Sequence, residues 1–167
     1  VEIWNQLNPD WPRSVTDQID NYKKHDPKYH YQAWVAEDKD KVIGTAQSEH
    51  SVSSFHPRKF LIEIYLHPDW HGQGIGKKLY EQILQDLNPF DPLNLRVQVR
   101  ESSARALRFF SDQGFIETKR DWISTLEVAK ADLNPYEGLE SELNKQGITI
   151  KSLAEIDDPD KYQKLHA

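Results

Sequence analysis

The chain contains no cysteine and no long apolar run, and its 27 acidic residues outnumber its 21 basic ones. Without cysteine, a disulfide framework, a thiolate metal site and a cysteine nucleophile are excluded. No apolar stretch approaches the roughly 20 residues that span a bilayer, and Val1 opens no signal-peptide pattern. A net charge of -6 disfavours nucleic-acid binding, which requires basic patches. We therefore expect a cytoplasmic protein that binds neither membranes nor nucleic acids.

The residues that are present favour one folded domain with room for an appendage. The chain has 167 residues, of which 37% are hydrophobic, and five of them are tryptophan. This is enough apolar material for a full core. Because the overall charge is negative, an anionic ligand would need local backbone donors and a few nearby cations, whereas a cationic amine would be attracted.

The first residues predict two helices. Positions 1–7 resemble the last turns of a helix, and the absence of an initiator methionine suggests that the front of the chain is missing. Ser14 and Thr16 offer N-caps for a second helix over residues 15–24.

Alternating apolar residues then predict a hairpin and further strands, separated by breakers rich in proline and glycine. The segment 38–40 has the turn chemistry of a hairpin, and Gly114 suits the end of a helix. The expected strands are 29–37, 41–49, 60–66, 93–99 and 115–128, with a polar loop at 48–57, a breaker at 88–92, and helices from Ile75 to Leu87 and from Ser102 or Ser103 to Gln113.

The segment 67–79 joins the most strand-like run to a helical pattern through a glycine-rich turn. Such a turn leaves backbone N–H groups without partners at the positive end of a helix, where glycines let an anion approach closely. It therefore predicts a phosphate or pyrophosphate site. The alternative is a turn that only connects the strand to the helix and binds no ligand, and the rest of the chain must decide between the two.

Two common phosphate loops fail on spacing. A Walker A loop requires glycine where His71 stands and Ser or Thr where Lys78 stands. A dinucleotide fingerprint that starts at Gly72 finds Lys77 at its third glycine position, and no parallel strand with an acidic end follows.

The segment instead resembles the acyl-CoA loop of the GNAT superfamily of N-acyltransferases, Arg/Gln-x-x-Gly-x-Gly/Ala. His71 stands at the first position, and Gly74 and Gly76 stand at the glycines. Residues 99–115 resemble a second GNAT signature, with Ser103 at its Asn, Ala106 at its Ala, Phe110 at its Tyr and Gly114-Phe115 at its end. The similarity covers residues 1–128.

The resemblance implies a mixed α/β (α+β) fold, with a mostly antiparallel sheet flanked by helices and splayed at the central strand. It also implies acetyl transfer from acetyl-CoA to a primary amine by direct attack. The implied cofactor-binding residues are Tyr65 and Leu66 through backbone groups, the loop residues His71, Gln73, Gly74, Ile75, Gly76 and Lys77, and Ser103 and Phe110; Lys77, Lys78, Arg105 and Arg108 are candidate phosphate partners or a solvated helix face.

For catalysis, the resemblance implies the N–H of Leu66 as the oxyanion donor, an interaction typically worth ~3 kcal/mol. Glu63 is the first candidate for the general base, ahead of His67 and Glu101, since an ammonium proton must be removed. A solvated or paired Glu63 is the plain alternative. Phe110 departs from the family pattern, because the usual Tyr protonates the departing thiolate and a phenyl ring cannot; solvent, Ser103 or another hydroxyl would serve, or the site is catalytically weak.

His67 and His71 have the i, i+4 spacing of a zinc helix, but Pro68 and the loop context spoil that geometry, and we expect no metal. The rival function is a non-catalytic CoA-binding or interaction module, and the acceptor is not identified by the sequence.

The domain layout expected is a GNAT domain over 1–134 and an extension over 135–167, with a helix at 135–146, a strand at 147–150 and a helix capped by 157–160. The extension resembles the entry into a second domain of tandem GNAT proteins. It would otherwise pack on the same domain, or its strand would fill a sheet edge left by a missing first strand. The sequence leaves open a monomer or a homodimer.

Overall fold

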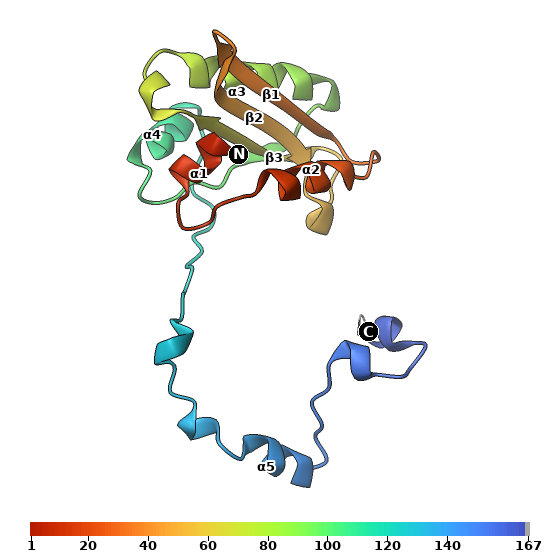
Figure 1. The fold of residues 1–167 in the computed structure, drawn as a ribbon. Helices are drawn as coiled ribbons and strands as arrows, with labels where there is room; N and C mark the ends of the chain where they lie inside the picture. The colour runs from red at the N-terminus through yellow and green to blue at the C-terminus, as the bar shows by residue number, and fades with distance from the viewer. Residues whose placement is uncertain (166–167) are drawn as a thin grey trace. The chain divides into compact units, whose positions relative to one another are not determined.

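A computed structural model describes residues 1–165 (Figure 1). The chain divides into two compact units, Val1–Ile116 and Glu117–Ala167. The first unit contains the whole sheet, and the candidate functional residues lie within it.

The sheet has four strands in the order β1-β2-β3-β4. β1 (Tyr31–Asp38) and β2 (Lys41–His50) form a hairpin, and β3 (Lys59–Leu66) is antiparallel to β2. The short β4 (Asn94–Arg96) is parallel to β3. Lys39 and Asp40 have φ values of 47° and 65°, so the hairpin turn takes the left-handed conformation that the acidic turn chemistry favours. This confirms the mixed, mostly antiparallel fold class.

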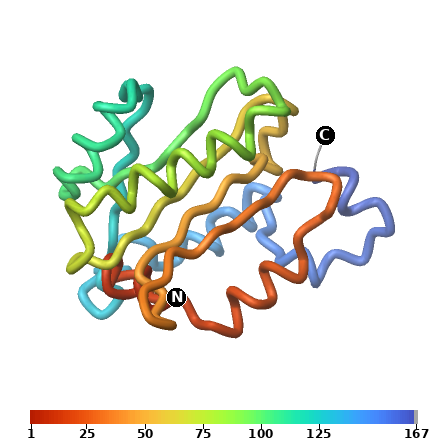
Figure 2. The backbone as a smooth tube through the Cα atoms, turned by 90° about the horizontal axis from the view of Figure 1, so that it is seen from above, coloured from red at the N-terminus to blue at the C-terminus, as the bar shows by residue number. Residues whose placement is uncertain are grey.

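Four helices of the first unit flank the sheet: α1 (Glu2–Leu7), α2 (Val15–Lys23), α3 (Ile75–Leu87) and α4 (Ala104–Asp112). In the view from above, α3 and α4 lie on one side of the sheet and α1 and α2 on the other (Figure 2). The side chain of Ser14 accepts a hydrogen bond from the Asp17 N–H, which confirms the cap expected for α2. Short 3-10 turns cover Val52–Ser54, Pro68–Trp70 and Asn88–Phe90.

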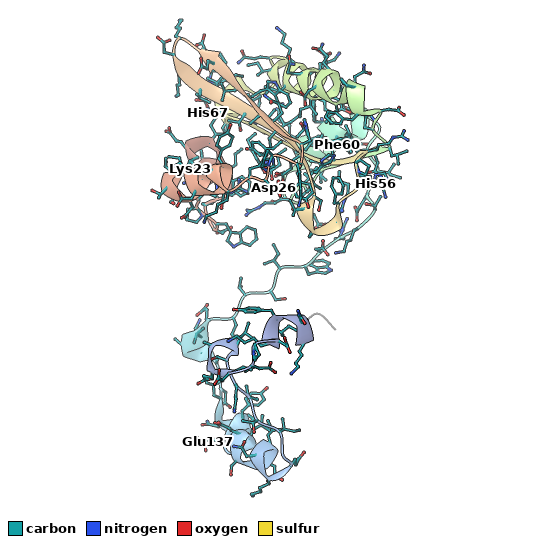
Figure 3. The ribbon with its side chains drawn as sticks, turned by 90° about the vertical axis from the view of Figure 1, so that its right-hand side faces the viewer. Lys23, Asp26, His56, Phe60, His67 and Glu137 are labelled. Atoms are coloured by element: carbon teal, nitrogen blue, oxygen red, sulfur yellow. The ribbon has the colours of Figure 1, made fainter. Side chains whose placement is uncertain are left out.

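The core lies between the sheet and the α3 face. Phe60, labelled in Figure 3, is only 1% exposed, and Ile83 and Leu87 are completely buried. α3 places its apolar residues three and four positions apart, so one stripe of the helix meets the sheet. The core cluster consists of Ala46, Phe60, Ile62, Leu79, Tyr80, Ile83, Leu87 and Phe110.

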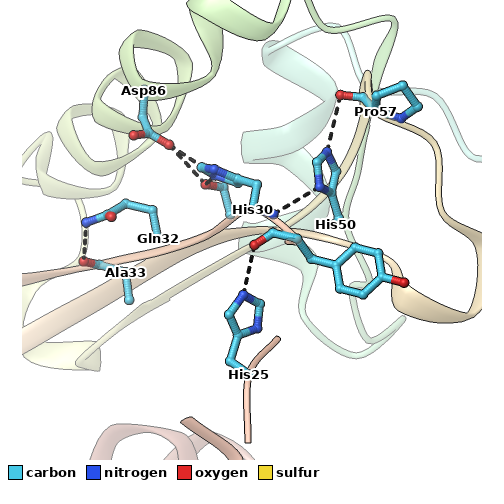
Figure 4. A network of polar contacts seen from close by, with 9 residues as sticks. His25, His30, Gln32, Ala33, His50, Pro57 and Asp86 are labelled. Carbon is cyan, nitrogen blue, oxygen red and sulfur yellow. Dashed lines mark hydrogen bonds and ion pairs between the residues drawn. The ribbon is translucent and has the colours of Figure 1, made fainter. Parts of the chain in front are cut away.

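A polar network is buried beside this core (Figure 4). His30 Nε2 lies 2.8 Å from Ser48 Oγ and 3.2 Å from an Asp86 carboxylate oxygen. The His30 backbone N–H donates to His50 Nδ1 at 3.0 Å, so the other ring nitrogen of His50 carries the proton that is donated to the Pro57 carbonyl at 3.2 Å. The network joins β2, α3 and the segment that precedes β1.

The sheet opens between β3 and β4. Their ladder pairs Lys59 to Leu61 with Asn94 to Arg96 and ends there, whereas β3 continues to Leu66. The splay expected at the central strand is therefore present. It also shortens the strand predicted over 93–99, because residues 97–99 diverge from β3 and have no ladder partner; their apolar side chains still pack against the core.

The second unit contains short helical segments and, within its described residues, no strand. Its segments are Val128–Lys130, Asn134–Tyr136, α5 (Leu139–Lys145), Leu153–Glu155 and α6 (Lys161–Lys164). A helix does form within 135–146, and Asp160 is the N-cap of α6 as expected.

The strands predicted at 115–128 and 147–150 are wrong. Trp122 is 81% exposed and Ile150 is 74% exposed, and neither segment pairs with the sheet. Apolar alternation alone does not make a strand, since a ladder partner must satisfy the backbone.

Candidate active site

The turn after β3 exposes a row of backbone donors. Gly72 and Gly74 have φ values of 79° and 80°, and Gly74 is the N-cap of α3. Among the described residues, no oxygen accepts a hydrogen bond from the N–H groups of residues 73–77. Beyond its chain neighbours and the adjacent helix backbone, a Cβ at Gly74 or Gly76 would meet no atom within 4 Å, so open space adjoins the turn at both glycines. The predicted loop residues therefore lie together at a helix N-terminus suited to an anion.

His71 fastens this turn to the end of β3. Its Nε2 lies 3.1 Å from the carbonyl oxygen of Leu66 and must carry the proton, since a carbonyl only accepts. His67 Nδ1 accepts from the Asp69 N–H at 3.3 Å. The two histidines thus have separate partners. No group of three or more His, Asp or Glu residues in the described chain is arranged to hold a metal ion.

One cation of α4 approaches the turn. Arg105 Nη1 lies 4.0 Å from the place that a Cβ on Gly72 would take. Lys77 instead lies 3.9 Å from Glu81 and is largely exposed, as on a solvated helix face. The structure therefore brings Arg105 to the predicted anion site more directly than Lys77.

The free edge of β3 presents the backbone of alternate residues. The His67 N–H donates to Ile43 of β2 at 2.8 Å, so the backbone groups of Tyr65 and His67 face β2. Those of Ile64 and Leu66 face the open side, where β4 has diverged. The Leu66 N–H therefore faces the open edge, whereas Tyr65 directs its backbone groups to β2. Ile64 shares the open edge with Leu66, which strand alternation indicates but the sequence reasoning missed.

On the opposite sheet face from α3 lies a cleft of about 300 Å³. Glu63 and Glu49 come from neighbouring strands, and Arg13 precedes α2. The cleft is lined by Arg13, Gln18, Asn21, Tyr22, His25, Tyr31, Gln47, Glu49 and Glu63. Of these residues the sequence indicated only Glu63, because the others converge through tertiary packing.

Burial raises the pKa of Glu63, although the Arg13 charge and a hydrogen bond with Tyr65 oppose the rise. Burial also raises the pKa of Glu49, and the neighbouring Glu63 charge adds to that effect. The pKa of Tyr65 is raised by burial, with the Glu63 charge next. A carboxylate with an elevated pKa inside a cleft is suited to accept a proton near neutral pH.

α1 and the following loop hold one wall of this region. Trp4 makes an edge contact with Tyr65 at 4.9 Å between ring centroids, and the Arg13 guanidinium lies 3.3 Å above the Trp4 ring. Asn5 accepts from the Arg13 N–H at 2.8 Å and donates to its carbonyl at 3.0 Å. These contacts fix Arg13 beside the carboxylates.

The two residues from the second motif have different surroundings. Ser103 is the N-cap of α4 but makes no side-chain cap hydrogen bond, and it is half-buried. Phe110 is 6% exposed and packs edge-on against Phe109 and Phe115 at 5.1 and 5.2 Å. Phe110 is therefore part of the core, and its ring offers no proton.

Comparison with known proteins gives a match over most of the first unit. The model of the acetyltransferase (GNAT) family matches residues 1–115. No curated protein matches the sequence. Within residues 1–165, no helix is both long and apolar enough to cross a membrane.

Solved structures with this fold include several acetyltransferases. An aminoglycoside acetyltransferase from an uncultured soil metagenomic sample has a TM-score of 0.56 and 18% identity, covering 75% of this chain and 85% of that one. The Escherichia coli ribosomal-protein-S18-alanine N-acetyltransferase has a TM-score of 0.53 and 22% identity, covering 70% and 71%. AAC(6')-Iy, in complex with a CoA-containing bisubstrate analogue, has a TM-score of 0.55 and 18% identity, covering 75% and 90%.

Proposed function

Because the chain belongs to the GNAT acetyltransferase family, we propose that it transfers an acetyl group from acetyl-CoA to a primary amine by direct attack. The observation that carries the proposal is the row of unpaired N–H groups at residues 73–77, next to the free backbone edge of β3. A pyrophosphate on these donors and a thioester beside Leu66 would use both features.

The residues fit the cosubstrate. The N–H groups of Gln73, Gly74, Ile75, Gly76 and Lys77 hold the pyrophosphate, and Arg105 adds a positive charge close to the turn. Acetyl-CoA supplies the acetyl group as a thioester. The Leu66 N–H donates to the carbonyl oxygen as negative charge develops there.

Glu63 is the general base in this proposal. The amine arrives as an ammonium ion, Glu63 takes its proton directly or through water, and the neutral nitrogen attacks the thioester carbon. A C–N bond forms and the C–S bond breaks. The attacking nitrogen loses a second proton to solvent as the amide forms, and the CoA thiolate takes a proton from solvent, directly or through Ser103, which solvent then reprotonates, since Phe110 has no proton to give. The products are an amide and CoA with a free thiol.

Several features support an amine as the acceptor. The cleft beside Glu63 is negatively charged, and related folds include enzymes named for aminoglycosides and for a ribosomal-protein alanine. We further propose a cytoplasmic protein, with a GNAT domain over 1–134 and an extension over 135–167. We expect no nucleic-acid partner, and analytical ultracentrifugation would distinguish a monomer from a homodimer.

A non-catalytic CoA-binding module is the second candidate, and Phe110 is the observation that favours it. Release of free thiol from acetyl-CoA, measured with a panel of primary amines, separates the two. Turnover with at least one amine, lost in Glu63→Gln but retained in the surface variant Glu2→Gln, supports catalysis. Saturable acetyl-CoA binding without thiol release on any amine supports the module.

A further inference from the structure

The cleft contains a second carboxylate that the acetyl-transfer step does not use. Glu49 is half-buried, and the charges of His25 and Arg13 act on it, but no hydrogen bond or salt bridge reaches its side chain from the described residues. Most carboxylates that lose water on folding gain such a partner, because an unpaired charge in a partly dry site is costly. Glu49 is therefore available to a ligand.

Strand register fixes where Glu49 lies relative to the proposed base. Gln47 of β2 pairs directly with Glu63 of β3, and Glu49 follows two residues later on the same face. Diagonal neighbours of this kind are roughly 7–8 Å apart across a sheet. Tyr31 pairs with Glu49 from the other side, so the carboxylate lies between an aromatic ring and the proposed base.

The cleft contains charged side chains of both signs. Arg13 is its only arginine or lysine, and its charge acts on both Glu49 and Glu63. Its stacking on Trp4 holds it in place. His25 also lines the cleft, and its Nε2 lies 3.0 Å from the Tyr29 carbonyl. The cleft lining therefore contains two carboxylates and one guanidinium, and the His25 charge also acts on Glu49.

We propose that this cleft selects acceptors with two amino groups, in which one nitrogen reacts beside Glu63 while the second, as an ammonium, pairs with Glu49. The inference rests on the proposed function and adds the class of its substrate. An α,ω-diamine with a chain of about four carbons matches the diagonal spacing of the two carboxylates. The tyrosine rings of the cleft, Tyr22 and Tyr31, provide apolar surface for the carbon chain.

A monoamine would fill the reactive position and leave Glu49 without a partner. A hydrogen bond to a charged group in such a site typically changes affinity about 10- to 100-fold. Diamines should therefore exceed monoamines in kcat/KM by about this factor. Glu49→Gln keeps the shape of the side chain and removes its charge, so it should abolish the preference for the diamine over the monoamine.

The test compares 1,4-diaminobutane with 1-aminobutane on the full chain. The variants are wild type, Glu49→Gln, and Glu37→Gln, an exposed carboxylate on the same hairpin that lies outside the cleft. Thiol release measures turnover, and calorimetry measures diamine binding with CoA present. We expect a 10- to 100-fold diamine preference in wild type and Glu37→Gln, and less than about threefold in Glu49→Gln.

The outcomes separate this inference from the proposed function. Turnover of both amines at similar rates, or a preference that survives in Glu49→Gln, overturns the inference and leaves acetyl transfer intact. Diamine binding that weakens in Glu49→Gln without any thiol release supports the cleft assignment and overturns the proposed function. If the wild-type protein neither binds the diamine nor turns it over, the inference is refuted.

Discussion

The turn at the start of α3 allows one glycine to be tested against another two residues away. Gly74 has a φ of 80°, a conformation that costs an L-residue with a Cβ about 1–2 kcal/mol. No atom lies within 4 Å of the added Cβ, so Gly74→Ala meets no steric clash and pays only the backbone cost. Gly76 lies inside the helix without a positive φ, where alanine is favoured by up to about 1 kcal/mol.

Gly74→Ala should therefore lower the Tm of the folded unit by about 4 °C or more, whereas Gly76→Ala should leave it unchanged or raise it slightly. If the turn relaxes to escape the strained φ, the N–H groups of residues 73–77 lose their common direction. We expect acetyl-CoA to bind Gly74→Ala at least about tenfold more weakly and Gly76→Ala within about threefold of wild type.

Calorimetric titration with acetyl-CoA and thermal unfolding of the same preparations give both quantities. Wild-type affinity in Gly74→Ala would refute the anion site at this turn, because the donors would then not depend on its backbone geometry. A larger loss of affinity in Gly76→Ala than in Gly74→Ala would contradict the assignment of the strained position.

Three further predictions concern the base, the histidine network and the core. Since burial raises the pKa of Glu63, kcat/KM should fall with decreasing pH at values above the usual glutamate range. Glu63→Gln should reduce kcat/KM about 10²- to 10⁴-fold. If the same acidic limb persists in this variant, the limb belongs to another group. Burial lowers the pKa of His30, although the charge of Asp86 opposes this, so the unfolded chain binds the proton more readily than the folded chain. The free energy of unfolding, measured by urea titration, should therefore be at its full value above about pH 6.5 and decrease as pH falls below it. The decrease should be smaller in His30→Gln. Ile83→Ala should cost about 2–5 kcal/mol and the half-exposed control Leu84→Ala less than about 1.5 kcal/mol in the same assay; equal costs would contradict the packing of α3.

The sequence predicted the elements whose signals are local. The Ser14 cap, the hairpin turn and the glycine-rich turn before Ile75 each follow from the chemistry of a few adjacent residues, and all lie where expected. The length of β4 could not be predicted, because the strand ends where β3 diverges from it rather than where its own apolar pattern stops. Strands expected near Trp122 failed for the same reason, since pairing is a property of two segments.

The residues of the candidate site also divide into those with a local sequence signal and those that only tertiary packing brings together. The glycine-rich turn before α3 is one continuous motif, so its residues could be named from the sequence. The cleft is assembled from α2, the three antiparallel strands and the loop before α2, and only Glu63 could be named in advance, because it shares β3 with Leu66. Glu49, Tyr31 and Arg13 come together through strand register and helix packing, which single-sequence periodicity does not encode.

The hydrogen bond from His71 to the Leu66 carbonyl connects the glycine-rich turn before α3 to the end of β3. If acetyl-CoA binds at this turn, it should hold the Leu66 peptide in place before the amine arrives, so we expect acetyl-CoA to bind first and free CoA to leave last. In double-reciprocal plots of initial rate against one substrate at several fixed concentrations of the other, the lines should then intersect. CoA should inhibit competitively with respect to acetyl-CoA and not with respect to the amine.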